Sequence, residues 1–246
     1  MARRTRKRQR AARRERNTRD ATPGHYQVSI SPRGLTRLLL IVAITLLACH
    51  TALALYHYRV EKLHFLVLQL FDVDQENNLP SWFSGCLLLT ASALLWFCAR
   101  TKRSGGDPWS GFWYALAVGF LLLSVDEVAG IHESINSVIV ITWAIPGGAA
   151  ALVIGLAFIP FLLHLPRRTG VLFALAAAMY LAGAAGLEVV GNSLVAQGLQ
   201  DTLRYKLWTL LEESLEIFGV ILFLDTLLRY MRGSGASGVH ASLEIA

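Results

Sequence analysis

The sequence feature that most constrains the fold is a series of six apolar segments, each about twenty residues long. A helix needs about 20 mostly apolar residues to cross a bilayer, and it satisfies its own backbone hydrogen bonds there. The composition agrees, with 54% hydrophobic and 16% charged residues. We therefore predict an all-α polytopic membrane helix bundle with six transmembrane helices. They are residues 35–56, 80–99, 109–130, 145–165, 170–192 and 206–231.

The basic residues predict the orientation of this bundle. Residues 1–34 contain eleven Lys and Arg against two acids. Further basic residues follow the second, fourth and sixth segments, at Arg100, Lys102, Arg103, Arg167, Arg168, Arg229 and Arg232. Since Lys and Arg are enriched in cytoplasmic connections, both termini are predicted to be cytoplasmic. The remaining connections and their helix ends then face outward.

The two tails have little apolar sequence. Residues 1–34 are predicted to be a disordered basic tail, and residues 232–246 a cytoplasmic C-terminal tail. The partner expected for the basic tail, besides the bilayer itself, is anionic lipid at the membrane surface. Nucleic acid is disfavoured because no aromatic residue is interleaved with the arginines to stack on bases. The sequence does not indicate an oligomeric state.

The external segment 57–79 changes character along its length. It is first too apolar for a solvated loop, which predicts that it lies in the membrane interface or packs on the bundle. It then becomes acidic, at Asp72, Asp74 and Glu76, just before Pro80. These acids either bind a ligand or form a solvated loop that caps the next helix.

Ionisable residues inside the apolar segments are costly and usually mark a function. In the predicted topology, acids from three helices share one outer layer. Asp126 and Glu127 end the third segment and are followed by His132 and Glu133; Glu188 lies in the fifth; and Glu212, Glu213 and Glu216 lie in the sixth. His50 lies in the outer half of the first segment. Helical spacing places Glu212 and Glu216 on one face.

So many carboxylates require either shared protons or a cation. We favour a divalent metal ion, with Zn, Mn, Fe and Ca all compatible with oxygen and nitrogen ligands. The candidate metal ligands are Asp126, Glu133, Glu188, Glu212, Glu213, Glu216, His50, Asp72, Asp74 and Glu76. The candidate catalytic residues are Asp126, Glu127, His132, Glu212 and Glu216. For each, a structural role as a helix-end, packing or solvated residue is the alternative.

Two short strings carry a resemblance. Residues 71–84, FDVDQENNLPSWFS, and residues 126–133, DEVAGIHE, resemble uncharacterised bacterial polytopic membrane proteins. This resemblance implies the bacterial inner membrane and no particular activity. The acidic segment before a helix is also loosely similar to membrane hydrolases related to alkaline ceramidases. Those enzymes have seven helices and a late His-x-x-x-His, which this sequence lacks.

Three functions fit these residues. The first is a membrane-embedded metal-dependent hydrolase, in which metal-bound water is the nucleophile and a carboxylate is the general base. The second is a cation or proton-coupled transporter. The third is a non-catalytic membrane scaffold whose acids bind a partner or a structural ion.

Overall fold

The computed structural model describes residues 31–136 and 142–233. Within these ranges the chain is helical, with no strand. The helices are α2 (Pro32–Arg59), α3 (Phe65–Phe71), α4 (Leu79–Ser104), α5 (Ser110–Ala129), α6 (Ile131–Asn136), α7 (Ala144–His164), α8 (Arg167–Leu181), the π-helix η1 (Ala182–Leu187), α9 (Glu188–Ala196) and α10 (Leu203–Gly233). The predicted helical class is confirmed.

Five helical stretches in the described part of the chain are long and apolar enough to cross a membrane. They are α2, α4, α5, α7 and the continuous run from α8 through η1 to α9. These five spans confirm a multi-pass membrane protein. The sixth predicted segment lies in α10, which has 31 residues but several acids. Its crossing of the membrane is not established by length and composition.

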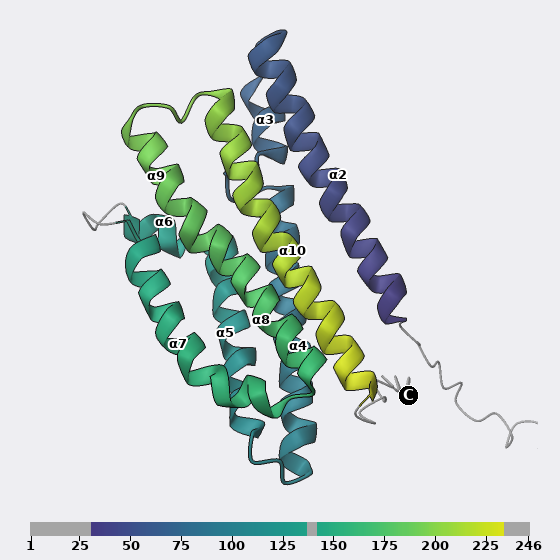
Figure 1. The fold of residues 1–246 in the computed structure, drawn as a ribbon. Helices are drawn as coiled ribbons and strands as arrows, with labels where there is room; N and C mark the ends of the chain where they lie inside the picture. The colour runs from purple at the N-terminus through teal and green to yellow at the C-terminus, as the bar shows by residue number, and fades with distance from the viewer. Residues whose placement is uncertain (1–30, 137–141, 234–246) are drawn as a thin grey trace, which may run out of the picture. The chain divides into compact units, whose positions relative to one another are not determined.

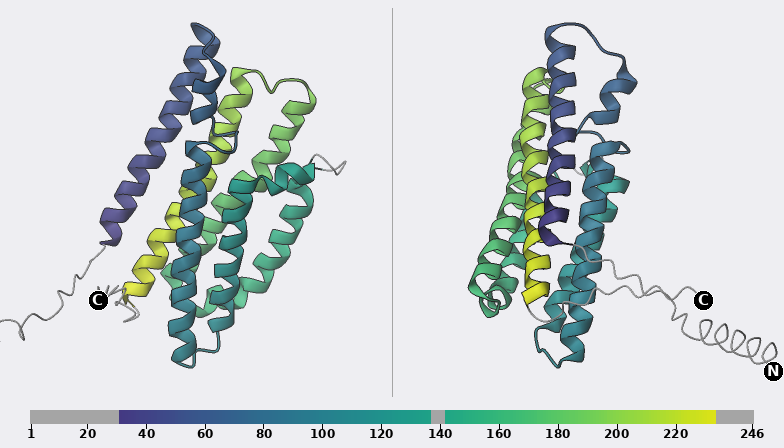
Figure 2. Two further views of the ribbon diagram at one scale, coloured as in Figure 1. Left: turned by 180° about the vertical axis from the view of Figure 1, so that it is seen from behind. Right: turned by 90° about the vertical axis from the view of Figure 1, so that its right-hand side faces the viewer.

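The long helices run alternately up and down, with α10 in the middle (Figures 1 and 2). Helix α10 packs against α2, α4, α8 and η1, while α4 and α5 form a close pair. One end of the bundle holds α3, α6, the start of α7 and the α9–α10 connection, and we call it the acidic end. The opposite end holds the starts of α2 and α8 and the ends of α4 and α10, and we call it the basic end (Figure 1).

The apolar core lies where α10 meets its neighbours. Trp113 of α5 is 1% exposed; it stacks on Tyr230 of α10 and meets the ring edge of Phe161 from α7. Helix α7, by contrast, leaves most of its large side chains exposed. They are Ile145, Leu152, Val153, Ile154, Leu156, Ile159 and Leu163. Such an apolar outer surface is expected where helices face lipid.

Local sequence signals determine where α4 begins and α5 ends. Asn78 and Ser81 form a reciprocal capping box, in which each side chain bonds the other residue's backbone N–H. Helix α5 ends at Gly130, which has a left-handed φ of 58° and whose N–H donates to the Asp126 carbonyl. A Cβ at Gly130 would also overlap the Glu76 carboxylate. These two signals bring the 72–78 loop against the end of α5.

Candidate functional site

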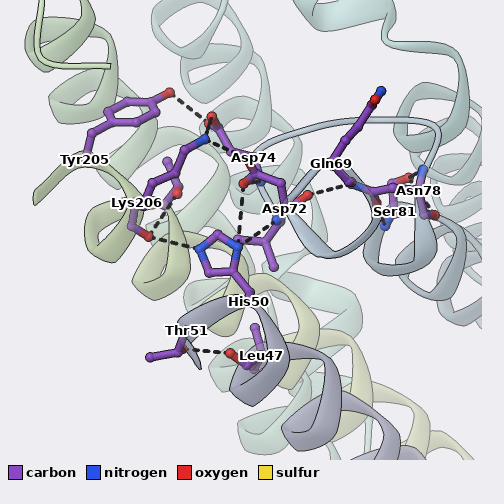
Figure 3. A network of polar contacts seen from close by, with 12 residues as sticks. Leu47, His50, Thr51, Gln69, Asp72, Asp74, Asn78, Ser81, Tyr205 and Lys206 are labelled. Carbon is purple, nitrogen blue, oxygen red and sulfur yellow. Dashed lines mark hydrogen bonds and ion pairs between the residues drawn. The ribbon is translucent and has the colours of Figure 1, made fainter. Parts of the chain in front are cut away.

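Lys206, near the start of α10, binds two acids of the 72–78 loop (Figure 3). Its Nζ lies 2.7 Å from Asp72 Oδ2 and 3.0 Å from Asp74 Oδ2. The Tyr205 hydroxyl donates to Asp74 Oδ1 at 2.8 Å. We call these four residues the lysine clamp. The clamp supplies positive charge to Asp72 and Asp74, which the sequence analysis had assigned to a metal ion.

His50 of α2 is built into the structure beneath the clamp (Figure 3). Its Nδ1 accepts the Val73 N–H at 3.2 Å, which makes Nε2 the protonated nitrogen, and Nε2 donates to the Lys206 carbonyl at 3.3 Å. The residue is 4% exposed. Both ring nitrogens are therefore hydrogen-bonded to backbone groups. His50 links α2 to the 72–78 loop and to α10.

Burial affects Asp74, one of the two acids of the clamp. It raises the pKa of the Asp74 carboxyl above its ordinary value, and the hydrogen bonds and charge of Lys206 and Tyr205 offset only part of that effect. Asp74 also lines a cavity on its other side. The clamp is therefore one wall of a larger site.

A polar cavity of about 240 Å³ lies at the acidic end, and we call it the outer cavity. Its walls come from the 72–78 loop, α6, α9 and α10. The lining residues are Asp74, His132, Glu188, Gly191, Asn192, Tyr205, Thr209, Glu212 and Glu213. Five of these nine residues are acids or histidine from four separate segments. The structure thus brings together residues that lie up to 139 positions apart, from Asp74 to Glu213.

Glu188 and Glu212 meet across this cavity. Asn192 fixes Glu188 by donating to its Oε1 at 2.9 Å, and the same amide donates to Thr142 Oγ1 at 2.8 Å. The Glu188 carboxyl lies within hydrogen-bonding reach of the Glu212 carboxyl, and Glu212 is only 6% exposed. Ionised carboxylates only accept hydrogen bonds. A proton shared between Glu188 and Glu212 would therefore satisfy this contact.

The π-helix η1 positions Glu188. A π-helical turn is wider than an α-helical one and is common at functional sites. The indole N–H of Trp208 donates to the Leu187 carbonyl at 3.0 Å, at the end of η1. Gly183 of η1 lets α10 come close, since a Cβ there would lie 2.8 Å from the Glu212 carbonyl and 2.7 Å from Glu216 Cγ. The backbone of η1 at Gly183 therefore packs directly against the Glu216 side chain of α10.

Glu216 lies one turn deeper than Glu212 on α10. The Tyr180 hydroxyl is within hydrogen-bonding reach of its carboxylate, and Glu127 and Glu188 are close enough to interact with it electrostatically. Glu127 in turn lies within reach of Ser84 on α4. Glu216 and Glu127 therefore extend the acidic set inward from the cavity.

Asp126 and His132 form an oriented pair at the end of α5. The His132 backbone N–H donates to Asp126 Oδ1 at 2.9 Å, and ring Nδ1 lies 3.0 Å from Oδ2. A carboxylate in this position fixes the orientation of an imidazole and, in the neutral ring, makes Nε2 the acceptor nitrogen. His132 lines the outer cavity, whereas Asp126 lies behind it.

The glutamates in and below the outer cavity, unlike Asp74, have no Lys or Arg partner in the described ranges. In the part of the chain that the structure describes, Glu127, Glu188, Glu212, Glu213 and Glu216 form no ion pair with Lys or Arg. Over the same ranges, no three His, Cys, Asp or Glu side chains are arranged to hold a metal ion. The divalent metal therefore stays a prediction, as does the sharing of protons among these carboxyls.

The structure divides the predicted site residues into groups. Asp74, His132, Glu188, Glu212 and Glu213 line the outer cavity; Glu127 and Glu216 lie deeper. Asp126 orients His132, and Glu76 packs on Gly130. His50 and Asp72 belong to the clamp region. The side chain of Glu133 lies outside what the structure describes.

Sequence reasoning missed the neutral polar residues of the cavity, namely Asn192, Tyr205 and Thr209. Helical spacing was the available signal. Asn192 is four residues after Glu188, and Thr209 is four residues after Tyr205 and four before Glu213. A search for polar residues on the same helical faces as the acids would have found all three.

Comparison with known proteins adds a family but no activity. A family model described as a domain of unknown function, DUF8692, matches residues 38–231. No curated protein and no solved structure matches the chain.

Proposed function

Because the chain belongs to the DUF8692 family, which has no assigned function, we propose a function from the geometry of the acidic end: a proton-coupled carrier of a small cation. In this proposal α10 is the sixth transmembrane helix, both termini are cytoplasmic and the outer cavity opens to the outside of the bacterial inner membrane. The carrier takes up protons and its solute at that cavity.

The contact between Glu188 and Glu212 is the observation that carries this proposal. Two neighbouring carboxyl groups repel each other when both are ionised. When they share one proton, only one is ionised, so the pair can bind and release a proton. Intramembrane acids that face a polar cavity are the usual proton sites of pumps and transporters. A negatively charged cavity of this size also favours a small positively charged solute over an anion.

A route for the proton continues inward along α10. Glu216 is four residues after Glu212 on the same face, and its partners Tyr180 and Glu127 belong to α8 and α5. Each step joins groups that can both donate and accept once one of them is protonated. The π-helix lies beside this route, because Gly183 packs closely against both Glu212 and Glu216.

Proteoliposomes test the proposal. Purified full-length protein is reconstituted with a trapped pH-sensitive dye, an inside-negative potential is imposed, and small amines are offered outside. We expect the wild-type protein to take up protons at a rate that an added amine changes. We expect Glu212→Gln to abolish this proton uptake. Glu61→Gln is the matched control because Glu61 is an exposed glutamate outside the cavity. Equal flux with and without wild-type protein, for every amine, would contradict the proposal.

The Asp126–His132 pair favours a second candidate, a metal-dependent hydrolase. Histidine ligands of metals are commonly held by a carboxylate on the other ring nitrogen, as Asp126 holds His132. In this case His132 and the cavity glutamates would bind a divalent ion, which would supply an activated water. Metal analysis of protein purified without chelators tests it. A stoichiometric metal that is lost in His132→Ala supports the hydrolase, and protein without metal argues against it.

A further inference from the structure

We propose that a second cavity, at the basic end of the bundle, binds the phosphate headgroup of an anionic phospholipid. The cavity measures about 350 Å³ and lies between the start of α8 and the end of α10. It is lined by Pro166, Arg168, Thr169, Leu172, Thr226, Arg229, Tyr230 and Gly233. It is at the opposite end from the outer cavity, so this inference does not depend on the proposed function.

The charge of this second cavity comes from two different helices. Arg229 of α10 donates from Nε and Nη2 to the Asp225 carboxylate, at 2.6 and 3.0 Å. Arg168 of α8 is close enough to Asp225 to interact with it electrostatically. Asp225 also accepts the Thr36 hydroxyl at 2.7 Å. One carboxylate thus gathers two guanidinium groups at the cavity and leaves the pair with a net positive charge.

A third cation, Lys102 of α4, lies beside Tyr230, which lines the cavity. Lys102 Nζ lies 5.2 Å from the centre of the Tyr230 ring and is within hydrogen-bonding reach of its hydroxyl. Lys102 is itself held 3.4 Å from Asp107. Guanidinium groups bind phosphate oxygens through paired hydrogen bonds, and lysine adds a point charge. A phosphate ligand fits this arrangement of cations better than a carboxylate ligand, which carries a smaller charge.

The backbone of α8 adds donors to this wall. Helix α8 has 15 residues and begins after Pro166 with no side-chain cap. The first N–H groups of a helix have no intrahelical acceptor and carry a partial positive charge, which favours anions. Arg168 and Thr169 belong to this first turn and also line the cavity. The side chains and backbone of α8 therefore approach one ligand position together.

The apolar surroundings identify the phosphate as that of a lipid. Leu172 and Pro166 form part of the cavity wall, and the α8 surface continues with Val171 and Leu175, which are 59% and 48% exposed. An acyl chain would cover these side chains while its headgroup reached the arginines. Basic pockets between transmembrane helices bind anionic lipid headgroups in other membrane proteins.

Native mass spectrometry of the full-length, delipidated protein tests this site. Phosphatidylglycerol and phosphatidylcholine are titrated separately into wild type, Arg168→Gln and Arg167→Gln. Arg167→Gln is the matched control, because Arg167 is the exposed neighbour of Arg168 and does not line the cavity. The basic N-terminal residues are the same in all three proteins, so their lipid binding cancels in the comparison.

We expect wild type to bind phosphatidylglycerol more tightly than phosphatidylcholine. Arg168→Gln should weaken phosphatidylglycerol binding on the order of tenfold, as the loss of one charge-assisted contact implies, whereas Arg167→Gln should stay close to wild type. Equal weakening by both substitutions, or equal affinity for the two lipids, would overturn the site. Displacement of the lipid by inorganic phosphate at similar concentration would assign the site to free phosphate instead.

Discussion

At the scale of single residues, Lys206 holds the acidic end together. Its ammonium lies between Asp72 and Asp74, with 16% of its side chain exposed. Lys206→Met leaves two neighbouring acids without their cation, and we expect a loss of about 2 kcal/mol in the free energy of unfolding. Thermal unfolding in detergent measures it. Arg204→Met, an exposed change of equal charge at the same end, should have little effect; equal losses would contradict the clamp.

Asp74 gives the acidic end a pH dependence. Its pKa in the folded protein is raised above 3.8, so the folded protein holds this proton more tightly than the unfolded chain. Its contribution to the free energy of unfolding is therefore fully present below pH 3.8 and is lost as the pH rises through the raised pKa. We expect Asp74→Asn to flatten this part of the unfolding profile. Asp201→Asn, an exposed loop substitution, should leave the profile unchanged.

At the scale of helices, apolar length and charge were enough to predict much of the fold. Each of the six apolar segments lies in helix, and the helical class follows from them. Asn78 just before α4 and Pro80 in its first turn also mark the start of this helix. The π-helix was not predictable, because Ala182–Leu187 reads as ordinary small-residue helix. Gly183 within it lies close to α10, and this tertiary contact exists only in the folded chain.

The close approach of η1 to α10 can be tested at Gly183. In Gly183→Ala the added Cβ would lie 2.7 Å from Glu216 Cγ and 2.8 Å from the Glu212 carbonyl, so the two helices must separate. We expect a loss of stability of about 1–3 kcal/mol. Gly155→Ala is the control, since nothing lies near Gly155 and alanine is the better helix former. Unchanged unfolding of Gly183→Ala would contradict the close packing.

The candidate site was predictable in outline but not in its partners. Topology alone placed the acids of α5, α9 and α10 in one layer, and the outer cavity brings Glu188, Glu212 and Glu213 together. The partners of Asp72 and His50 were not predictable, because Lys206 and Val73 reach them through folding of the external segment. The sequence shows which groups are costly to bury, but not which contact compensates each one.

At the scale of the whole molecule, the proposal requires six crossings. Five helical stretches are apolar enough by themselves. The proposal adds α10 as the sixth, with Glu212 and Glu213 turned towards the outer cavity. Epitope tags at the two ends should both be protected in intact spheroplasts and both be accessible in inverted vesicles. Tags on opposite sides would mean that α10 does not cross, and the outer cavity would then lie outside the bilayer.

The central claim is that the acidic end stores a proton between Glu188 and Glu212. Infrared spectroscopy of the purified protein at neutral pH detects it as the C=O stretch of a protonated carboxyl. We predict a band that Glu212→Gln and Glu188→Gln each remove and that Glu61→Gln leaves in place. A spectrum with only ionised carboxylates, or a band that survives both substitutions, would contradict the shared proton and the carrier proposed from it.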